Sequence, residues 1–230
     1  SEMSDAAGTS WLDTGKRAWD QRLLAATGLE LSHMPDLVEG TAVSGQLRSD
    51  LKAKWGIEGT AVVAGGAGDN AASACGMGTV APGTAFVSLG TSGVLFASND
   101  AYRPNPASAV HAFCHAIPNT WHQMGVILSA TDSLNWLSGV TGKDAAALTG
   151  GLGEDLAAPG PEIFLPYLSG ERTPHNDAAI RGVFVALSHD SGDKALTKAV
   201  LEGVAFAIRD SLDALQMAGT ELSRVTAIGG

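Results

Sequence analysis

This chain has few cysteines and few basic residues. Only two of its 230 residues are cysteines, Cys75 and Cys114, which argues against a disulfide scaffold and favours a reducing, cytoplasmic location. Lys and Arg number 14 against 24 Asp and Glu, giving a net charge of −10, and the basic residues are scattered. A nucleic-acid surface needs clustered positive charge, so we expect no nucleic-acid partner.

Long apolar runs and fixed-period repeats are also missing. No stretch approaches the roughly 20 apolar residues that span a bilayer, and no signal-peptide pattern opens the chain, so we expect no membrane partner. Hydrophobic residues nevertheless make up 45% of the sequence, and charged residues only 17%. A chain of this length and composition can bury a sizeable core, in one large domain or in two lobes.

Both ends of the sequence look like interruptions of longer elements. The opening stretch SEMSDAAGTSWLD reads like the middle of a domain, and Val225–Gly230 is a short apolar strand that runs into a glycine turn. Because a buried strand needs its continuation, we expect the chain to be a piece of a longer protein.

Strand and helix patterns alternate along the chain. The helix signal is strongest over 193–217, where apolar residues recur at a spacing of about 3.6 and Gly219 follows the end. Two hairpins are predicted, with strands 85–89 and 94–97 around one turn and strands 110–117 and 121–126 around another. Further helices are expected over 9–27, 46–55 and 128–138, further strands over 60–64 and 163–168, and a loop over 149–161. This mixture indicates an α/β fold with a mixed sheet.

The first candidate site is the segment Gly65–Asn70. A predicted strand runs into a glycine turn, and Asp69 stands where a helix begins. Glycines let the backbone turn sharply and let a substrate come close, and a carboxylate there could accept a proton from a substrate hydroxyl in phosphoryl transfer. Asp69 could equally be only the N-cap of the helix, and both roles can hold at once. The glycine spacing is not a full dinucleotide-binding fingerprint.

The second candidate is the predicted hairpin turn Gly90–Gly93, with Thr91 and Ser92 at its tip. Such a turn can direct several N–H groups at one anion and thereby bind phosphate oxygens. An ordinary hairpin also needs glycine, and that simpler interpretation is favoured if the motif is taken alone. A third, much weaker pattern is the glycine pair Gly229 and Gly230 after the last strand, which could let a flat adenine or a ribose lie against backbone.

Two polar clusters leave alternatives open. His111, Cys114 and His115, with His122 across the turn, look like a possible zinc cluster. Strand alternation puts His111 and His115 on one face and Cys114 on the other, so no metal site is expected, and the histidines more simply line a sheet edge or a domain interface. The loop 169–176 (SGERTPHN) could order a neighbouring lobe or a nucleotide site, or it could be an exposed turn with an internal ion pair.

The order of these motifs resembles the FGGY carbohydrate kinase family, and within it the members that act on D-xylulose. The resemblance covers essentially the whole chain and is carried by Gly68-Asp-Asn-Ala-Ala72, Ser88-Leu-Gly-Thr-Ser-Gly93, His111-Ala-Phe-Cys-His-Ala116, Phe164-Leu-Pro-Tyr-Leu-Ser-Gly-Glu-Arg-Thr-Pro-His175, Val200-Leu-Glu-Gly-Val-Ala205 and Ile228-Gly-Gly230.

The resemblance implies an actin-like, ribonuclease-H-like ATPase fold with ATP between two lobes. Residues 1–80 would be the end of the first, sugar-binding lobe, and residues 81–230 the front of the second, ATP-binding lobe. It also implies an ATP-dependent phosphotransferase with an alcohol group as acceptor, which converts D-xylulose to D-xylulose 5-phosphate. The alternatives are a kinase of another polyol or sugar acid (glycerol, gluconate or ribulose) and a non-catalytic actin-like nucleotide-binding module. The family resemblance further suggests a homodimer.

The resemblance also assigns residue roles. Asp69 matches the catalytic base and binds the sugar with Asn70, while Mg²⁺ bridges the ATP phosphates. Phosphate contacts fall on Gly90, Thr91, Ser92 and Gly93, and adenosine contacts on Gly229 and Gly230.

Departures from the family pattern are specific. The first phosphate hairpin of the family, with its Asp-x-Gly-Thr pattern, is absent, so we expect the isolated chain to have little or no activity. Ala186 stands where the family usually has glycine, and Ala195 where it usually has a polar residue.

Overall fold

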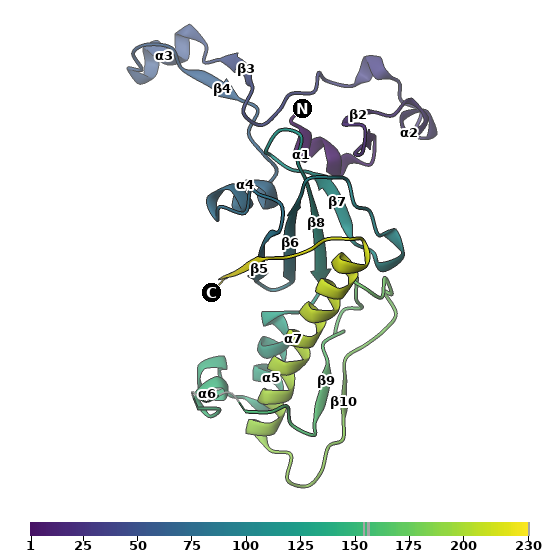
Figure 1. Cartoon of the computed structure of the whole chain (residues 1–230). Helices are drawn as coiled ribbons and strands as arrows, with labels where there is room; N and C mark the ends of the chain where they lie inside the picture. Colours follow the sequence, from purple (N-terminus) through teal and green to yellow (C-terminus); the bar gives the residue numbers. More distant parts are fainter. Residues whose placement is uncertain (154, 156, 230) are drawn as a thin grey trace. The chain divides into compact units, whose positions relative to one another are not determined.

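A computed structural model describes residues 1–153, 155 and 157–229 of the chain (Figure 1). The chain divides into two compact units. Unit 1 holds Ser1–Thr84, Ala97–Arg103 and Ala112–Gln123, and unit 2 holds Ala85–Phe96, Pro104–His111 and Met124–Gly230. Each unit is therefore assembled from segments that are distant in the sequence. No helix among the described residues is both long enough and apolar enough to cross a bilayer.

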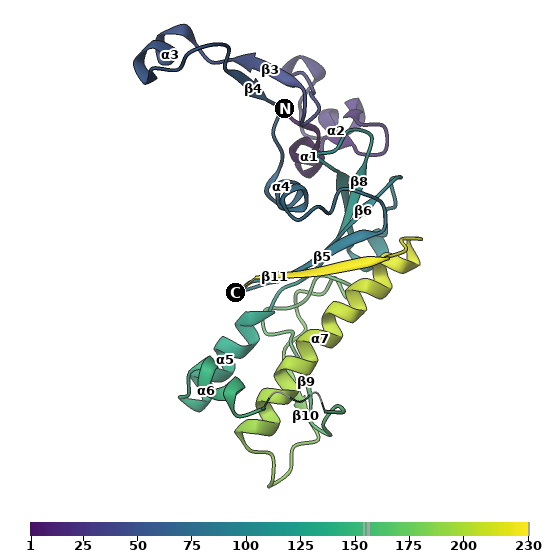
Figure 2. The same cartoon turned by 60° about the vertical axis from the view of Figure 1, so that its left-hand side comes forward.

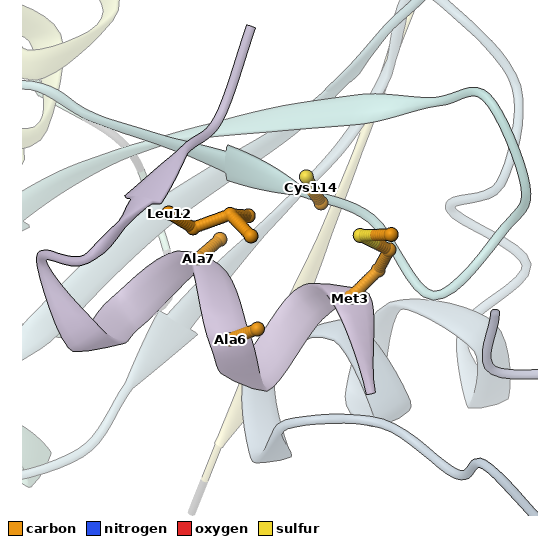
Figure 3. Close-up of a cluster of buried hydrophobic side chains, with 5 residues drawn as sticks. All are labelled: Met3, Ala6, Ala7, Leu12 and Cys114. Atoms are coloured by element: carbon orange, nitrogen blue, oxygen red, sulfur yellow. The ribbon is translucent and has the colours of Figure 1, made fainter. Parts of the chain in front are cut away.

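Unit 1 is built on short elements around a small core. Its helices and strands are α1 (Met3–Ala6), η1 (Ala7–Thr9), β1 (Leu12–Asp13), β2 (Ala18–Trp19), α2 (Gln21–Ala26), η2 (Leu31–His33), β3 (Val43–Gln46), α3 (Ser49–Trp55), β4 (Val62–Ala64) and α4 (Asp69–Gly76). Met3, Ala6 and Ala7 turn their side chains from the first helical turns toward Leu12 and Cys114, and all five are buried (Figure 3).

The helix predicted over 9–27 is wrong. Ser10 has a left-handed φ of 67°, β1 and β2 form an antiparallel pair, and only Gln21–Ala26 is α-helical. Local side-chain bonds explain the difference, because Thr9 and Asp20 satisfy backbone N–H groups that a continuous helix would use itself. The apolar spacing belongs to a turn and a hairpin rather than to a helix.

The middle of unit 1 follows the sequence more closely. The helix predicted over 46–55 is confirmed for Ser49–Trp55, and it ends at Gly56 in the left-handed conformation that favours glycine. Residues 43–46 form β3, which pairs antiparallel with β4. Gln46, predicted as the first helical residue, is therefore the last residue of this strand. The predicted strand over 60–64 is therefore confirmed for its last three residues.

A five-stranded sheet contains residues assigned to both units. Its strand order is β11-β5-β6-β8-β7, where the strands are β5 (Thr84–Leu89), β6 (Gly93–Asn99), β7 (His111–Cys114), β8 (Trp121–Ile127) and β11 (Arg224–Gly229). Both predicted hairpins are confirmed by β5 with β6 and by β7 with β8. A 3-10 turn, η3 (Pro106–Ser108), precedes β7.

Unit 2 packs helices and a small strand pair together. The elements are α5 (Thr131–Thr141), α6 (Ala145–Gly150), β9 (Ile163–Leu165), β10 (Val183–Val185) and α7 (Asp193–Met217). The long helix α7 runs beside α5 and β9 (Figure 2). Leu137, Leu148, Phe164, Ala199 and Val200 form the core between them. Gly203 on α7 is required there, since a Cβ would lie 2.2 Å from the Phe164 carbonyl oxygen.

Two predicted boundaries in unit 2 are corrected. The helix predicted over 128–138 begins later, at Thr131, and runs through Gly139 to end before Gly142, which has a left-handed φ of 70°. The predicted loop over 149–161 begins inside α6, and its residues 154 and 156 lie outside the described residues. The predicted helix over 193–217 is confirmed at both ends.

Candidate active site

Glycines bring the Asp69 corner close to a neighbouring segment of unit 1. A Cβ on Gly65 would lie 2.5 Å from the Glu39 carbonyl oxygen, and a Cβ on Gly40 would lie 2.5 Å from the Gly66 carbonyl oxygen. These contacts leave no room for any side chain, and Gly66 also has a φ of 85°. The glycine run therefore shapes the turn that leads from β4 to α4.

The start of α4 is anchored from the other end of unit 1. The Gly68 N–H donates to Ser4 Oγ at 2.9 Å, and Ser4 Oγ in turn donates to the buried Glu2 carboxylate at 2.6 Å. Gly68 is the N-cap residue of α4, and no side chain caps the N–H groups of the first turn through this position. Sequence reasoning missed Glu2 and Ser4, because the bond between Ser4 and Gly68 spans 64 residues and leaves no local signal.

Asp69 is the first residue of α4 and its side chain is exposed. Its Oδ1 atom accepts hydrogen bonds from the Asn70 backbone N–H at 2.7 Å and from Asn70 Nδ2 at 3.1 Å. Within the part of the chain that the structure describes, no other group bonds to this carboxylate. The interpretation of Asp69 as only an N-cap is therefore wrong, because Gly68 takes that position and one carboxylate oxygen is available to a ligand.

The hairpin tip of unit 2 is held from behind by the start of α5. The Ala130 N–H donates to the Thr91 carbonyl at 2.8 Å, and the Thr131 N–H donates to the Gly90 carbonyl at 3.0 Å. The Thr131 hydroxyl donates to the same Gly90 carbonyl at 2.7 Å. Gly93 lies flush against this support, since a Cβ there would be 2.7 Å from Ile127 Cγ1.

This arrangement directs N–H groups away from α5. In a trans peptide the N–H points opposite to the C=O of the same plane, and the Gly90–Thr91 and Thr91–Ser92 bonds are trans. Because both carbonyls face α5, the N–H groups of Thr91 and Ser92 point outward, and both residues are exposed. Neither N–H has a partner among the described residues, so the tip can bind an anion with main-chain donors.

Gly229 lies beside the strand that leads into this hairpin. Its φ is 128°, and a Cβ would be 2.3 Å from the Leu89 carbonyl oxygen, so glycine is required at this position. The pairing of β11 with β5 thus brings Gly229 next to the residue before Gly90. Gly230, the other half of the predicted pair, lies outside the described residues.

An apolar groove of about 210 Å³ opens next to the hairpin support. Leu89, Ala130 and Thr131, which flank or hold the hairpin, form one part of its wall. The rest of its wall comes from α5 and α7, through Leu134, Val200, Leu201, Val204, Ala205 and Ile208. A mostly apolar groove next to main-chain anion donors suits a ligand with a flat apolar end and a charged end.

The histidine and cysteine cluster is built into the protein interior. His115 is fully buried and its Nε2 lies 3.1 Å from the Thr79 carbonyl oxygen, while the buried His122 meets His115 edge to face. His115 and His122 are therefore interior residues, whereas His111 lies on β7, an edge strand of the five-stranded sheet, as the sequence predicts. Burial lowers the pKa of His115 and raises the pKa of Cys114 to about 11, so the thiol stays protonated at neutral pH. Across the described residues, no group of three potential metal ligands comes together.

The polar loop 169–176 is tied into unit 2 through a buried carboxylate. Glu171 Oε1 accepts hydrogen bonds from the Leu128 N–H at 2.9 Å and from the Arg172 N–H at 2.7 Å. Burial raises the pKa of Glu171. Thr173 Oγ1 accepts from the Val126 N–H at 3.0 Å. The alternative of an exposed turn with an internal ion pair is therefore wrong for Glu171, which is only 3% exposed.

Two family descriptions match the chain, one on each side of residue 80. The FGGY family of carbohydrate kinases, C-terminal domain, matches residues 85–230, and the N-terminal domain of the same family matches residues 1–76.

Individual relatives match along the whole chain. A xylulose kinase of Escherichia coli (strain K12) is 47% identical over 231 residues, which cover 100% of this chain and 48% of that protein. The crystal structure of a "xyloylose kinase" from Brucella ovis has a TM-score of 0.98 and 66% identity, and covers 100% of this chain and 48% of the other. A gluconate kinase structure from Lactobacillus acidophilus has a TM-score of 0.90 at 25% identity, over 100% and 47% of the two chains. The predicted fold class is thereby confirmed, and the chain spans about half the length of the curated relatives it matches.

Proposed function

This chain belongs to the FGGY family of carbohydrate kinases, and from that premise we propose that the protein containing it transfers a phosphoryl group from ATP to D-xylulose. The product is D-xylulose 5-phosphate. Support for this acceptor comes from the relatives of Escherichia coli and Brucella ovis, which are named for it and match the chain along its whole length. Because the chain spans about half of those proteins, the activity of the whole protein is part of the proposal.

The observation that carries the proposal is the Asp69 carboxylate. It is exposed at a glycine turn and one of its oxygens has no partner among the described residues. In the proposed reaction this oxygen accepts the proton of the sugar hydroxyl as that hydroxyl attacks the γ-phosphorus of ATP. The bond between the γ-phosphorus and its bridging oxygen breaks, and ADP leaves. Asn70 is proposed to bind the sugar beside it.

The hairpin and the groove of unit 2 are proposed to hold the nucleotide. The outward N–H groups of Thr91 and Ser92 are proposed to bind phosphate oxygens. Gly90 and Gly93 flank them in the same proposed turn, and Gly93 leaves no room for a Cβ against Ile127. The neighbouring apolar groove suits the adenine ring, and Gly229 with Gly230 is proposed to contact the adenosine. Mg²⁺ arrives as part of MgATP and neutralises charge on the phosphates.

The family domains also support the predicted boundary between lobes. We propose it near residue 80, because one match ends at residue 76 and the next begins at residue 85. Residues 1–80 then belong to the sugar-binding lobe and residues 81–230 to the ATP-binding lobe. A cytoplasmic location and a homodimer remain predictions from the sequence.

Gluconate is the strongest alternative acceptor, because a gluconate kinase structure superimposes on the chain with a TM-score of 0.90. A purely nucleotide-binding module is the other alternative, and it would have no use for an exposed carboxylate at the glycine turn. Both can be separated from the proposal with one substrate panel.

The test is a kinetic screen of the full-length protein with MgATP and D-xylulose, L-ribulose, glycerol or gluconate. We expect kcat/KM for D-xylulose to exceed that of each other acceptor by about tenfold or more, as a hydroxyl-reading site allows. A higher value for gluconate would reject D-xylulose as the substrate. Binding of ATP without consumption on all four acceptors would instead reject the kinase function.

A further inference from the structure

Glu171 is a carboxylate that unit 2 buries in a loop between β9 and β10. The side chain is 3% exposed, and its Oε1 atom accepts two backbone N–H groups. Its Oε2 atom is buried and has no hydrogen-bond partner in the described chain. Burying a carboxylate carries a large desolvation penalty. A neutral residue would avoid this penalty if the loop had no other role than to reverse the chain.

One of the two N–H groups belongs to Leu128, at a position where regular structure is interrupted. Leu128 follows the end of β8 (Trp121–Ile127) and precedes α5 (Thr131–Thr141). Its N–H therefore has neither a strand partner nor a helical acceptor. Glu171 supplies the missing acceptor from a loop 43 residues further along the chain, and so fixes the course of the backbone between strand and helix.

The backbone that Glu171 fixes is the support of the phosphate hairpin. Ile127 and Ala130, on either side of Leu128, form the surface against which Gly93 packs. The N–H groups of Ala130 and Thr131 and the Thr131 hydroxyl hold the two hairpin carbonyls. A shift of this segment would turn the hairpin peptides and redirect the N–H groups of the tip.

We propose that Glu171 is a positioning residue for ATP: its buried carboxylate holds residues 127–131 in the conformation that orients the main-chain donors of the Gly90–Gly93 hairpin. This inference rests on the proposed function, since it assumes that the hairpin binds the ATP phosphates. It assigns no chemical step to Glu171, which acts only through the backbone.

The same loop offers a matched control in Thr173. Its hydroxyl accepts from the Val126 N–H at 3.0 Å and donates to the Ala109 carbonyl at 3.2 Å. Thr173 is as buried as Glu171 and also ties the loop to the end of β8. Its partners Val126 and Ala109 lie outside the segment 127–131 that supports the hairpin, so Thr173→Val should weaken the loop attachment without turning the hairpin donors.

The test compares four forms of the full-length protein: wild type, Glu171→Ala, Glu171→Gln and Thr173→Val. The dissociation constant for MgATP is measured by calorimetry, and KM is measured for ATP and for the sugar. We expect Glu171→Ala to weaken ATP binding about tenfold or more while the sugar KM changes less than about twofold. Glu171→Gln keeps an acceptor at Oε1, so its ATP affinity should stay within about threefold of wild type. Thr173→Val should lower the thermal midpoint but leave ATP affinity within about twofold.

Several outcomes would overturn the positioning role. They are an unchanged ATP affinity in Glu171→Ala, an equal loss in Thr173→Val, or a parallel loss toward ATP and sugar. If Glu171→Ala does not fold, Glu171→Asp takes its place, because the shorter side chain withdraws the acceptor from Leu128. A folded Glu171→Asp protein with wild-type ATP affinity would also overturn it. Failure of the wild-type protein to bind ATP would instead reject the proposed function itself.

Discussion

The Asp69 corner and the Gly90–Gly93 hairpin present different functional groups: a side-chain carboxylate at the first and main-chain N–H groups at the second. At the corner, one exposed side chain carries the proposed chemistry, and its only bonds among the described residues go to the adjacent Asn70. At the hairpin, the proposed donors are main-chain N–H groups, and the residues behind them set their direction through four hydrogen bonds to the Gly90 and Thr91 carbonyls.

The difference predicts how each region responds to substitution. A carboxylate that makes few structural bonds can be replaced without disturbing the fold, so its loss should appear in turnover alone. A main-chain site has no side chain to remove, so it can be damaged only through its support, and ATP affinity and stability should then change together. Each of the following substitutions tests one side of this comparison.

The largest expected effect is that of Asp69→Asn on turnover. Removing a general base should lower kcat by about 10²–10⁴-fold or more, while the thermal midpoint stays near that of wild type because the side chain is exposed. Steady-state kinetics of the full-length protein measure this. Asp50→Asn is a matched control, because Asp50 is also an exposed carboxylate in the first turn of a helix, and its kcat should be unchanged. A similar kcat in both variants would remove Asp69 from the mechanism.

Gly229→Ala should show the opposite pattern. The new Cβ would meet the Leu89 carbonyl at 2.3 Å with a positive φ, so we expect a loss of about 2–4 kcal/mol in unfolding free energy, together with weaker ATP binding. Denaturant melts and ATP titration measure both effects. Gly139→Ala is the control, since it lies inside α5 with open space around it, and it should be neutral or slightly stabilising. Unchanged stability in Gly229→Ala would refute the described packing of β11.

Thr131→Val removes one bond from the hairpin support and keeps the shape of the side chain. Loss of the bond to the Gly90 carbonyl should weaken ATP binding by about three- to tenfold, as expected for one hydrogen bond. Thr141→Val, at the other end of the same helix, removes a hydroxyl bond to the Leu137 carbonyl and should leave ATP affinity unaltered. Equal losses of ATP affinity in the two variants would show that the Thr131 bond to Gly90 has no specific role, and that only the stability of helix α5 affects ATP binding.

The smallest expected effect concerns the pH dependence of stability in Glu171→Gln. Burial raises the pKa of Glu171 above its ordinary value of 4.5, although the N–H groups of Arg172 and Leu128 and the charges of His175 and Arg172 oppose the shift. The unfolded chain therefore loses this proton at a lower pH than the folded chain, and the stability contribution of the group falls as pH rises through the raised pKa.

Glutamine does not titrate, so Glu171→Gln should gain stability relative to wild type between about pH 4 and pH 7. Urea midpoints at the two pH values measure the gain. Thr173→Val changes no titratable group, so its urea midpoint should fall below that of wild type by the same amount at both pH values. A difference between Glu171→Gln and wild type that does not change with pH would contradict the raised pKa.

Regular periodicity made unit 2 easier to predict than the start of unit 1. The apolar residues of 193–217 recur with helical spacing over a long run, and α7 has the predicted ends. The apolar residues of 9–27 gave a similar but shorter signal, and the side chains of Thr9 and Asp20 overrode it with local backbone bonds. Short polar residues therefore decide the structure where the apolar pattern is brief.

The candidate site divides in the same way. Asp69 and the Gly90–Gly93 turn could be named from the sequence, because glycine turns next to strands are local patterns. Their supports could not, since Ser4 lies 64 residues from Gly68 and Glu171 lies 43 residues from Leu128. Such pairs are created by the tertiary fold, so no spacing of residues along the sequence predicts them.

The most direct test of the account measures binding and transfer on one preparation of the full-length Asp69→Asn protein. Calorimetry gives its affinity for MgATP, and ³¹P NMR follows phosphorylation of D-xylulose beside the wild type. We predict that the variant binds MgATP as wild type does, within about twofold, and that sugar phosphate accumulates only with the wild type. Sugar phosphate formed by the variant at the wild-type rate would show that the Asp69 carboxylate is not the catalytic base.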